Sequence, residues 1–397
     1  MMRIQSDNTD QIKIGLALSG GGSRAIAFHL GCMRALHNRG LLTKVQVLSS
    51  VSGGSVIGAM YAYSDCSFEE FEDRIEKLLN SGLSKEIARF TLFSLETPKI
   101  LVSLVTSGLL AVFGRILGLG VRALGFLGVR WGWLQTISKS LQAPVPRFAS
   151  RTTAFVRFLD RRYFHGRSLS NVGRNSLQVI INATELKTET AFRYGSEESG
   201  CWRFGKLVSS PTVAKAVAAS AAFPGLLPAI DERQKFSKDG ATTEHRVVIA
   251  DGGVYDNLGT SCLIPGRDSK FSTNVTEVDF IIACVAGQGL PDATSMPYFW
   301  PSRMISTVNI IQRRTHSMTF DILHRLSEKG DIKGFLLPYL GQQDDRLPSP
   351  PPDLISRDET FDYRTDFNSM TTDDISKLSQ RGEQLTRNLI ETYHPTL

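Results

Sequence analysis

The sequence has few of the features that mark secreted proteins or proteins stabilised by bound zinc. No two of its cysteines have the C-x2-C spacing of a zinc site, and the first residues, MMRIQSDNTDQ, lack the apolar core of a secretory signal. The cysteines are odd in number and widely spaced: Cys32, Cys66, Cys201, Cys262 and Cys284. We therefore expect reduced, mostly buried thiols in a cytoplasmic chain.

Acidic residues are absent from two long stretches. None occurs between Gln11 and Ser64, and none from residue 97 to residue 159, a span that holds eight lysines and arginines. The net charge of +6 over 397 residues is too weak to indicate a nucleic acid polymer as partner. With 42% hydrophobic residues, the chain can bury a sizeable core and is not a disordered protein.

The hydrophobic pattern predicts alternating strands and helices. Residues 12–18 (IKIGLAL) alternate as a strand does, residues 23–40 have helical spacing, and residues 45–48 form a second short apolar strand before another apolar segment. Three further strands are expected at residues 176–186, 246–253 and 278–286. An alanine-rich helix is expected at 211–230, and two C-terminal helices at 305–326 and 372–393. This order favours an α/β fold with a parallel sheet covered on both faces.

The acid-free span is an apolar, basic insert at about residues 92–165. Residues 100–114 form an uncharged run of 15 residues, which is short for a membrane span. The glycines of the insert weaken a helix prediction. Beyond them come basic and tryptophan side chains suited to a lipid headgroup boundary: Arg115, Arg122, Arg130, Trp131 and Trp133. A membrane or lipid contact is the favoured interpretation; a buried lid, a dimer contact and a true span remain open.

The glycine run LSGGGSRA predicts an anion site. A dinucleotide loop would need an acidic residue about 20 positions later, which the sequence lacks, and the G-K-[ST] phosphate loop is absent too. The amides of Gly20, Gly21 and Gly22, at the start of a helix, could instead form an oxyanion hole, with Arg24 strengthening the field or touching a phosphate. A plain tight turn is the alternative.

The stretch VLSSVSGGSVIGAM resembles a nucleophile elbow. That motif is usually G-x-S-x-G, because strand and helix pack too closely for side chains two places either side of the serine. Here Ser50 replaces the first glycine and Gly54 is the second, which places Ser52 on a strand-to-helix turn. The neighbouring serines suit ordinary capping.

A serine nucleophile needs a base, and Asp251 is the candidate. It ends an apolar strand and precedes Gly252 and Gly253, at the edge where parallel sheets place their sites. A triad with His316 or His324, in the order Ser, Asp, His, stays open as an alternative.

Three blocks in this order resemble the patatin-like phospholipases: SGGGSR, SVSGGS and DGGVYDNLG. The similarity covers roughly residues 13–259 apart from the insert. It implies a three-layer αβα fold with a mainly parallel central sheet. It also implies a Ser-Asp dyad without histidine or cofactor, in which Ser52 is the nucleophile, Asp251 the base, and Gly20, Gly21 and Gly22 hold the oxyanion. Ser50, and Ala25 in place of a glycine after Arg24, depart from the family pattern.

The resemblance implies a catalytic domain at 11–295 and a mainly helical extension at 296–397 packed on it. It implies hydrolysis of fatty-acyl esters of phospholipids or lysophospholipids by a cytoplasmic enzyme bound peripherally to the inner membrane face. An esterase, thioesterase or acyltransferase on soluble substrates, and a non-catalytic binding module, are the alternatives. Homo-oligomerisation and control by a small-molecule activator stay open.

Overall fold

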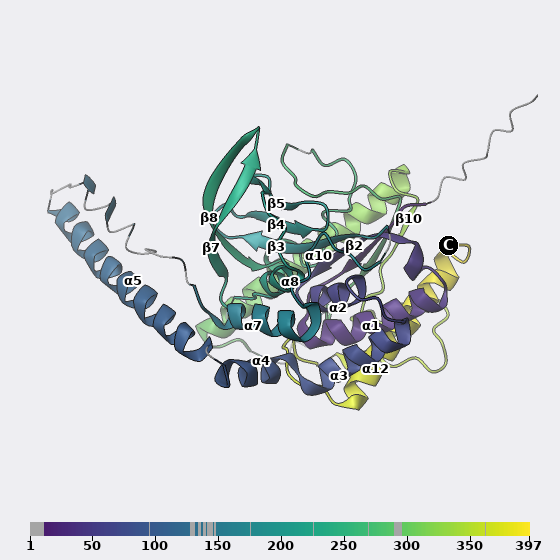
Figure 1. The fold of residues 1–397 in the computed structure, drawn as a ribbon. Helices are drawn as coiled ribbons and strands as arrows, with labels where there is room; N and C mark the ends of the chain where they lie inside the picture. Colours follow the sequence, from purple (N-terminus) through teal and green to yellow (C-terminus); the bar gives the residue numbers. More distant parts are fainter. Residues whose placement is uncertain are drawn as a thin grey trace, which may run out of the picture.

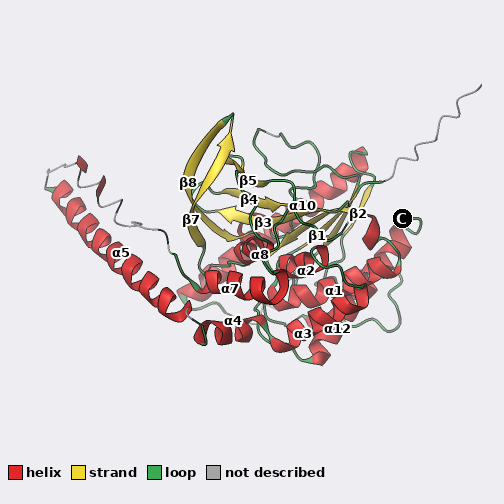
Figure 2. Cartoon of the chain, viewed as in Figure 1, coloured by secondary structure: helices red, strands yellow, loops and turns green. Residues whose placement is uncertain are grey.

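The architecture comes from a computed structural model, which describes residues 12–94, 96–127, 132–133, 136–137, 140, 146, 148–174, 176–224, 226–268, 270–289, 296–361 and 363–397. Helices pack on both faces of one sheet, so the described chain forms the three layers of an αβα fold (Figures 1 and 2). Arg130 and Trp131 of the insert lie outside the described residues.

The sheet runs in the order β10-β9-β1-β2-β3-β4-β5-β6-β7-β8, and β3 also pairs with β8. Its strands are β1 (Ile14–Leu18), β2 (Val45–Val51), β3 (Gln178–Glu185), β4 (Thr190–Gly195), β5 (Ser199–Cys201), β6 (Gly205–Leu207), β7 (Ile230–Lys238), β8 (Ala241–Asp251), β9 (Phe280–Cys284) and β10 (Gly334–Leu336).

The sheet is mixed, which corrects the expectation of a mainly parallel one. β10, β9, β1, β2 and β3 pair in parallel, whereas every pairing from β3 through β4 to β8 is antiparallel. Short loops join β3 through β6, and β7 turns directly into β8, which only antiparallel neighbours allow. The two halves meet at β3.

The helices are α1 (Gly22–Asn38), α2 (Gly53–Ala62), α3 (Phe68–Ser81), α4 (Leu83–Leu92), α5 (Glu96–Phe126), α7 (Arg151–Leu159), α8 (Val213–Ser220), α9 (Gly253–Asp256), α10 (Trp300–Lys329), α11 (Arg357–Thr360) and α12 (Thr372–Tyr393). In Figure 1, α1, α2 and α12 cover the near face of the sheet and α10 crosses behind it.

Strand alternation divides the core between these two faces. In β1, Leu16 and Leu18 join the large cluster under α1, α2 and α12, whereas Ala17 joins a smaller cluster that includes Leu323 of α10. All three side chains are buried, as expected for a central strand covered on both sides.

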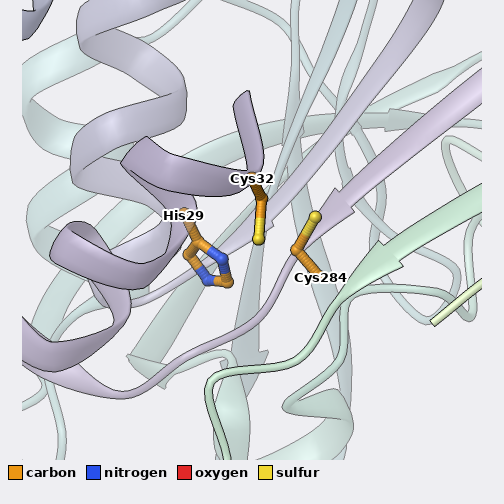
Figure 3. A group of neighbouring side chains, drawn as sticks. All are labelled: His29, Cys32 and Cys284. Carbon is orange, nitrogen blue, oxygen red and sulfur yellow. The ribbon is translucent and has the colours of Figure 1, made fainter. Parts of the chain in front are cut away.

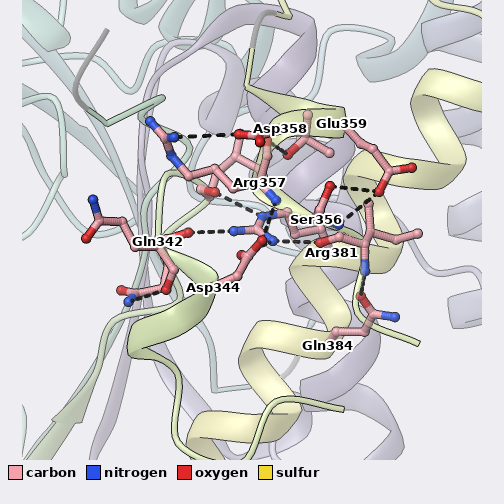
Figure 4. A network of polar contacts seen from close by, with 12 residues as sticks. Gln342, Asp344, Ser356, Arg357, Asp358, Glu359, Arg381 and Gln384 are labelled. Carbon is pink, nitrogen blue, oxygen red and sulfur yellow. Dashed lines mark hydrogen bonds and ion pairs between the residues drawn. The ribbon is translucent and has the colours of Figure 1, made fainter. Parts of the chain in front are cut away.

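The C-terminal residues are integral to this fold. α12 crosses α1 so closely that a Cβ on Gly31 would overlap the carbonyl of Ser379, and a Cβ on Gly382 that of Phe28. Figure 4 shows the fully buried Arg381 of α12 as the centre of a polar network. Its guanidinium donates to the carbonyls of Leu340, Ile355 and Gln342 and pairs with Asp344 at 2.9 Å.

The insert contains α5, a single 31-residue helix that projects from the body (Figure 1). At about 1.5 Å per residue it is about 46 Å long, and it is long and apolar enough to cross a membrane, with little of its most apolar stretch buried. Its base is held by the buried Glu96, which pairs with Arg157 of α7 and with Lys99. Arg115, Arg122 and Trp133 are exposed.

Candidate active site

Ser52 lies at a strained corner between β2 and α2. Its backbone has φ 51° and ψ −118°, a left-handed conformation that a residue with a side chain rarely adopts. Its N–H donates to the hydroxyl of Ser220 at 2.9 Å, which helps to hold the corner. Strain of this kind persists where surrounding structure enforces it, and it is concentrated at functional sites.

The residues on either side of Ser52 make the corner fit. A Cβ on Gly54 would overlap the carbonyl of Leu18, so only glycine allows α2 to approach β1 this closely. Ser50 is fully buried and lies 3.5 Å through its hydroxyl from the carbonyl of Ile180. Gly54 and Ser50 thus pack closely against neighbouring strands on either side of Ser52, which is the residue at the turn.

Asp251 is the last residue of β8, paired with Ala183 of β3. It is 2% exposed, and its Oδ1 accepts the N–H of Gly253 at 2.7 Å, while its Oδ2 has no hydrogen-bond partner among the described residues. Burial raises the pKa of Asp251 to about 7, opposed by the Gly253 N–H and the Ser52 hydroxyl. The structure thus brings the hydroxyl and the carboxyl together, although no well-aligned hydrogen bond joins them.

Gly252 and Gly253 let this loop pass through a crowded region. A Cβ on Gly252 would overlap the carbonyl of Asn182, and one on Gly253 would lie 3.0 Å from Asp251 Oδ1. Gly252 thus lets the loop pass close to β3, and the Gly253 N–H donates to the carboxylate.

The glycine loop lies directly beside Ser52. A Cβ on Gly20 would lie 3.3 Å from the Ser52 Cβ and would overlap the side-chain oxygen of Asn257. The Gly20 N–H, however, donates to the carbonyl of Asn257 at 3.0 Å. This corrects the expectation for Gly20: its amide is already engaged, and its contribution is close approach.

The amides of Gly21 and Gly22 stay candidates for an oxyanion hole. The two glycines have φ 148° and φ 62°, and no hydrogen bond outside α1 engages their amides among the described residues. A Cβ on Gly53, the residue after the serine, would lie 2.9 Å from the Gly22 nitrogen, so the loop lies against the elbow. These amides lie at the positive end of the 17-residue helix α1.

The Arg24 guanidinium is engaged with main-chain carbonyls, which corrects the expectation that it touches a phosphate. Its side chain is buried, its Nε donates to the carbonyl of Ala286 at 3.0 Å, and its Nη1 donates to that of Tyr363 at 2.9 Å. Burial lowers the pKa of Arg24 to about 10. The guanidinium therefore ties the glycine loop to the segments after β9 and before α12.

Sequence reasoning missed Ser220 and Asn182. The Ser220 hydroxyl accepts from the Ser52 N–H, contacts the Ser55 hydroxyl at 2.9 Å and donates to the carbonyl of Asn182 at 2.6 Å. The only signal was a serine at the end of the alanine-rich segment AVAAS, just before a predicted helix stop. A serine at such a place usually marks only the end of a helix.

Three histidines that bear on the mechanism have other partners. The His316 ring lies 3.5 Å from the side-chain amide of Asn257, and the His324 ring packs edge-on against Phe335. His29 hydrogen bonds through Nε2 to the carbonyl of Ser19, at 2.9 Å, just before the glycine loop. Among the described residues, no histidine hydrogen bonds to Ser52 or Asp251, so the triad alternative gains no support.

A thiol–imidazole group lies behind the glycine loop. Figure 3 shows His29 and Cys32 of α1 close to Cys284 of β9, and their ligand atoms lie within 4.8 Å of one another. This donor set suits a soft metal ion. These donors, however, are enclosed in the core, where His29 Nε2 hydrogen bonds to the carbonyl of Ser19 and the Cys32 thiol donates to the carbonyl of Gly382. We therefore assign this group to core packing.

A cavity of about 980 Å³ lies at the other end of α2. It is lined by residues that include Tyr63, Arg74, Arg162 and Arg167. Ser52 precedes the first residue of α2, whereas Tyr63 follows the last, so this cavity does not adjoin the serine.

Comparison with known proteins identifies the fold's relatives. The family model described as patatin-like phospholipase matches residues 16–264. VipD from Legionella pneumophila is 15% identical over 97% of this chain and 67% of its own, with a TM-score of 0.42. The human GIVD cytosolic phospholipase A2 is 12% identical over 98% of this chain and 62% of its own, with a TM-score of 0.49. Among curated proteins the sequence has no significant match.

A third solved structure, of the type III effector ExoU, is 14% identical over 96% of this chain and 53% of its own, with a TM-score of 0.33. This chain therefore spans between about half and two thirds of the length of the solved proteins it resembles.

Proposed function

This chain belongs to the patatin-like phospholipase family, and we propose that it is a lipid acyl hydrolase that uses a Ser52–Asp251 dyad. The observation that carries the proposal is the strained, buried Ser52 beside a carboxyl whose Oδ2 has no hydrogen-bond partner within the described part of the chain. An acyl-enzyme mechanism needs this pair of groups: a nucleophile and a base within reach of its proton.

The reaction begins when the Asp251 carboxylate takes the proton of the Ser52 hydroxyl as the serine oxygen attacks the acyl carbonyl. The carbonyl oxygen gains negative charge, the protonated Asp251 returns the proton to the leaving alcohol, and an acyl ester on Ser52 remains. Water then attacks this ester with Asp251 again as base, releasing the fatty acid and restoring Ser52. A carboxyl with a pKa of about 7 exchanges protons readily near neutral pH.

The amides of Gly21 and Gly22 hold the developing negative charge. Fixed donors in a water-poor site contribute roughly 3 kcal/mol each to the transition state in comparable enzymes. The Gly22 amide is also at the N-terminus of α1, where the helix dipole adds to this stabilisation. No cofactor takes part in this scheme.

The substrate class follows from the family and from the insert. We propose that the substrates are phospholipids or lysophospholipids, and that α5 with Arg115, Arg122 and Trp133 contacts the inner face of the membrane. The catalytic part at 11–295 and the extension at 296–397 then act as one body, because β10 joins the same sheet and α12 packs on α1.

The test is labelling and hydrolysis with purified protein. Wild type should react with a fluorophosphonate probe and cleave a water-soluble short-chain ester, whereas Ser52→Ala should lose both. Ser55→Ala is the matched control, because Ser55 is the next buried serine and also contacts Ser220. Labelling retained in Ser52→Ala and lost in Ser55→Ala would remove Ser52 from the mechanism. Comparing vesicle phospholipid with soluble ester separates a lipase from a soluble-ester hydrolase.

A further inference from the structure

α10 leaves an unusual amount of apolar surface uncovered. It has 30 residues, yet Leu323 is its one fully buried side chain. Its N-terminal half and the residues just before it carry large apolar side chains that are each more than half exposed: Met296, Tyr298, Phe299, Trp300, Met304, Ile305, Ile310 and Ile311. We call residues 296–311 the α10 apolar segment.

The α10 apolar segment leads directly to the catalytic loop. Gln312, the next residue, donates through Nε2 to the carbonyl of Gly253 at 3.1 Å, and His316 lies one turn further along, against Asn257. Residues 300–311 therefore extend about 18 Å of helix beyond the point where α10 touches the loop that carries Asp251.

The loops near the site expose apolar side chains as well. Val254 and Tyr255 follow Gly253 and are 48% and 44% exposed. Phe223 and Leu226 follow α8, whose last residue, Ser220, holds the elbow, and they are 37% and 46% exposed. Exposed apolar side chains thus occur in both loops that adjoin the serine and the aspartate, as well as in the α10 apolar segment.

The charge on this part of α10 has one sign. Arg303, Arg313 and Arg314 are its ionised residues before Asp321, and no acidic residue occurs from 296 to 320. The segment begins with three successive exposed aromatic residues, Tyr298, Phe299 and Trp300. Aromatic, aliphatic and basic side chains without acids are the composition of a helix that lies in the interface of an anionic bilayer.

We propose that the α10 apolar segment docks on an anionic phospholipid bilayer and holds the entrance of the active site against it. This proposal rests on the proposed function, and it adds a second membrane contact, separate in sequence from α5. α5 projects away from the body, so it can tether the protein, whereas the α10 apolar segment adjoins the catalytic loop and can set the orientation in which a lipid reaches Ser52.

A bilayer fits this surface better than a second copy of the chain does. Two copies facing each other through this segment would bring Arg303, Arg313 and Arg314 of both together with no acidic side chain between residues 296 and 320 to balance them. An anionic headgroup layer supplies that balance.

The test compares one triple variant with a matched control. Met304→Gln/Ile305→Gln/Ile311→Gln replaces three exposed apolar side chains with glutamine, a polar residue that favours the helix. The control, Val208→Gln/Phe271→Gln, removes side chains of similar exposure from loops outside α10. Ile305→Gln alone serves if the triple variant folds poorly, as judged from its unfolding midpoint.

Each protein is assayed on vesicles of phosphatidylglycerol and phosphatidylcholine and on a water-soluble short-chain ester. We expect the triple variant to bind vesicles about 10- to 100-fold more weakly and to hydrolyse vesicle lipid correspondingly more slowly, with soluble-ester kcat/KM unchanged. The control should match wild type in both assays. Arg115→Gln/Arg122→Gln should weaken vesicle binding. Its effect on the turnover of each bound enzyme should be smaller than that of the triple variant.

Three outcomes overturn the proposal. Vesicle binding and turnover equal to wild type would show that the segment does not meet the bilayer. A change in sedimentation mass with unchanged vesicle binding would show that a second copy covers it. Equal losses in the control would show that any exposed apolar group suffices. Absence of soluble-ester hydrolysis in wild type would instead count against the proposed function, which keeps the two failures distinct.

Discussion

Asp251 should make the protein less stable as the pH rises, and replacing it with asparagine should remove that loss. In the folded protein burial raises the pKa of this carboxyl from 3.8 to about 7. Between these two values the folded state binds a proton that the unfolded state has released. The stability that the neutral carboxyl provides is therefore fully present below pH 3.8 and is lost as the pH rises through about 7.

The size of the effect follows from the shift. A difference of about 3 pKa units at about 1.4 kcal/mol per unit gives about 4 kcal/mol of unfolding free energy, which is an upper bound. Asp251→Asn keeps an oxygen that can accept the Gly253 N–H but carries no charge at any pH. The variant should therefore gain stability over wild type between pH 4 and pH 7, with a plateau above pH 8.

The assay is chemical denaturation of both proteins across this pH range. All other groups titrate alike in the two, so the change in their stability difference isolates position 251. The same ionisation governs catalysis, since only the carboxylate can accept the serine proton, and kcat/KM for a soluble ester should rise through about pH 7. A stability difference independent of pH, with an activity profile flat from pH 5 to 8, would refute a buried, neutralised Asp251.

Other predictions test the loop and its supports. His29→Ala removes the donor to the Ser19 carbonyl, just before the glycine loop, so it should cost about 1–3 kcal/mol of unfolding free energy and lower kcat more than it raises KM; wild-type kcat would show that this hydrogen bond does not position the loop. Gly22→Ala should reduce esterase activity at least 10-fold because its Cβ would overlap the Asp366 carbonyl, whereas Gly40→Ala, with a similar positive φ and open space around it, should spare activity. Arg24→Gln should lower the unfolding midpoint while changing KM equally for phospholipid and neutral ester, because its guanidinium binds main-chain carbonyls; a selective rise in the phospholipid KM would contradict this.

Local patterns predicted the parallel half of the sheet well. The alternation in residues 12–18 and the apolar runs that follow the glycine loop correspond to β1 and β2, and the pattern at 372–393 coincides with α12. These segments are buried on both faces or strongly amphipathic, so tertiary packing reinforces what their periodicity already favours.

The antiparallel half was harder to predict because its strands carry weak signals. β5 and β6 have three residues each, too few for any period, and β7 (IDERQKFSK) is largely polar. Such strands form because their neighbours offer backbone partners, which a single sequence does not reveal.

The sequence also understated α5, since its glycines reduce helix propensity. The cost is about 1 kcal/mol for each glycine, against the favourable helix propensity of the leucines and alanines between them. Gly114 and Gly118 are buried on one face of the helix, while Phe113 and Ile116 are exposed on the other. Two glycines of the helix thus lie on its buried side, and composition alone does not distinguish them from glycines that break a helix.

Roles that depend on distant partners lay beyond sequence reasoning altogether. Arg24 looks like a phosphate contact by its place after three glycines, and the amide of Gly20 looks like an oxyanion donor. Both have partners more than 200 residues away, at Ala286 and at Asn257. Only the folded chain shows that these polar groups are already engaged.

The candidate site is assembled at the seam of the sheet, and Asn182 of β3 joins its parts. Its side-chain amide donates to the Ser49 hydroxyl at 2.9 Å and to the Ser50 carbonyl at 3.1 Å, on the strand that ends at the elbow. Its own carbonyl accepts the Ser220 hydroxyl and lies against Gly252.

One buried residue on β3 therefore contacts β2, the end of α8 and the loop after Asp251. The parallel half delivers Ser52 and the glycine loop, the antiparallel half returns Asp251 to β3, and the pairing of Ala183 with Asp251 fixes their register. A slip of β8 by one residue would turn the carboxyl to the other face of the sheet. The placement of Asp251 near Ser52 thus depends on the register of β8 against β3 and of β3 against β2.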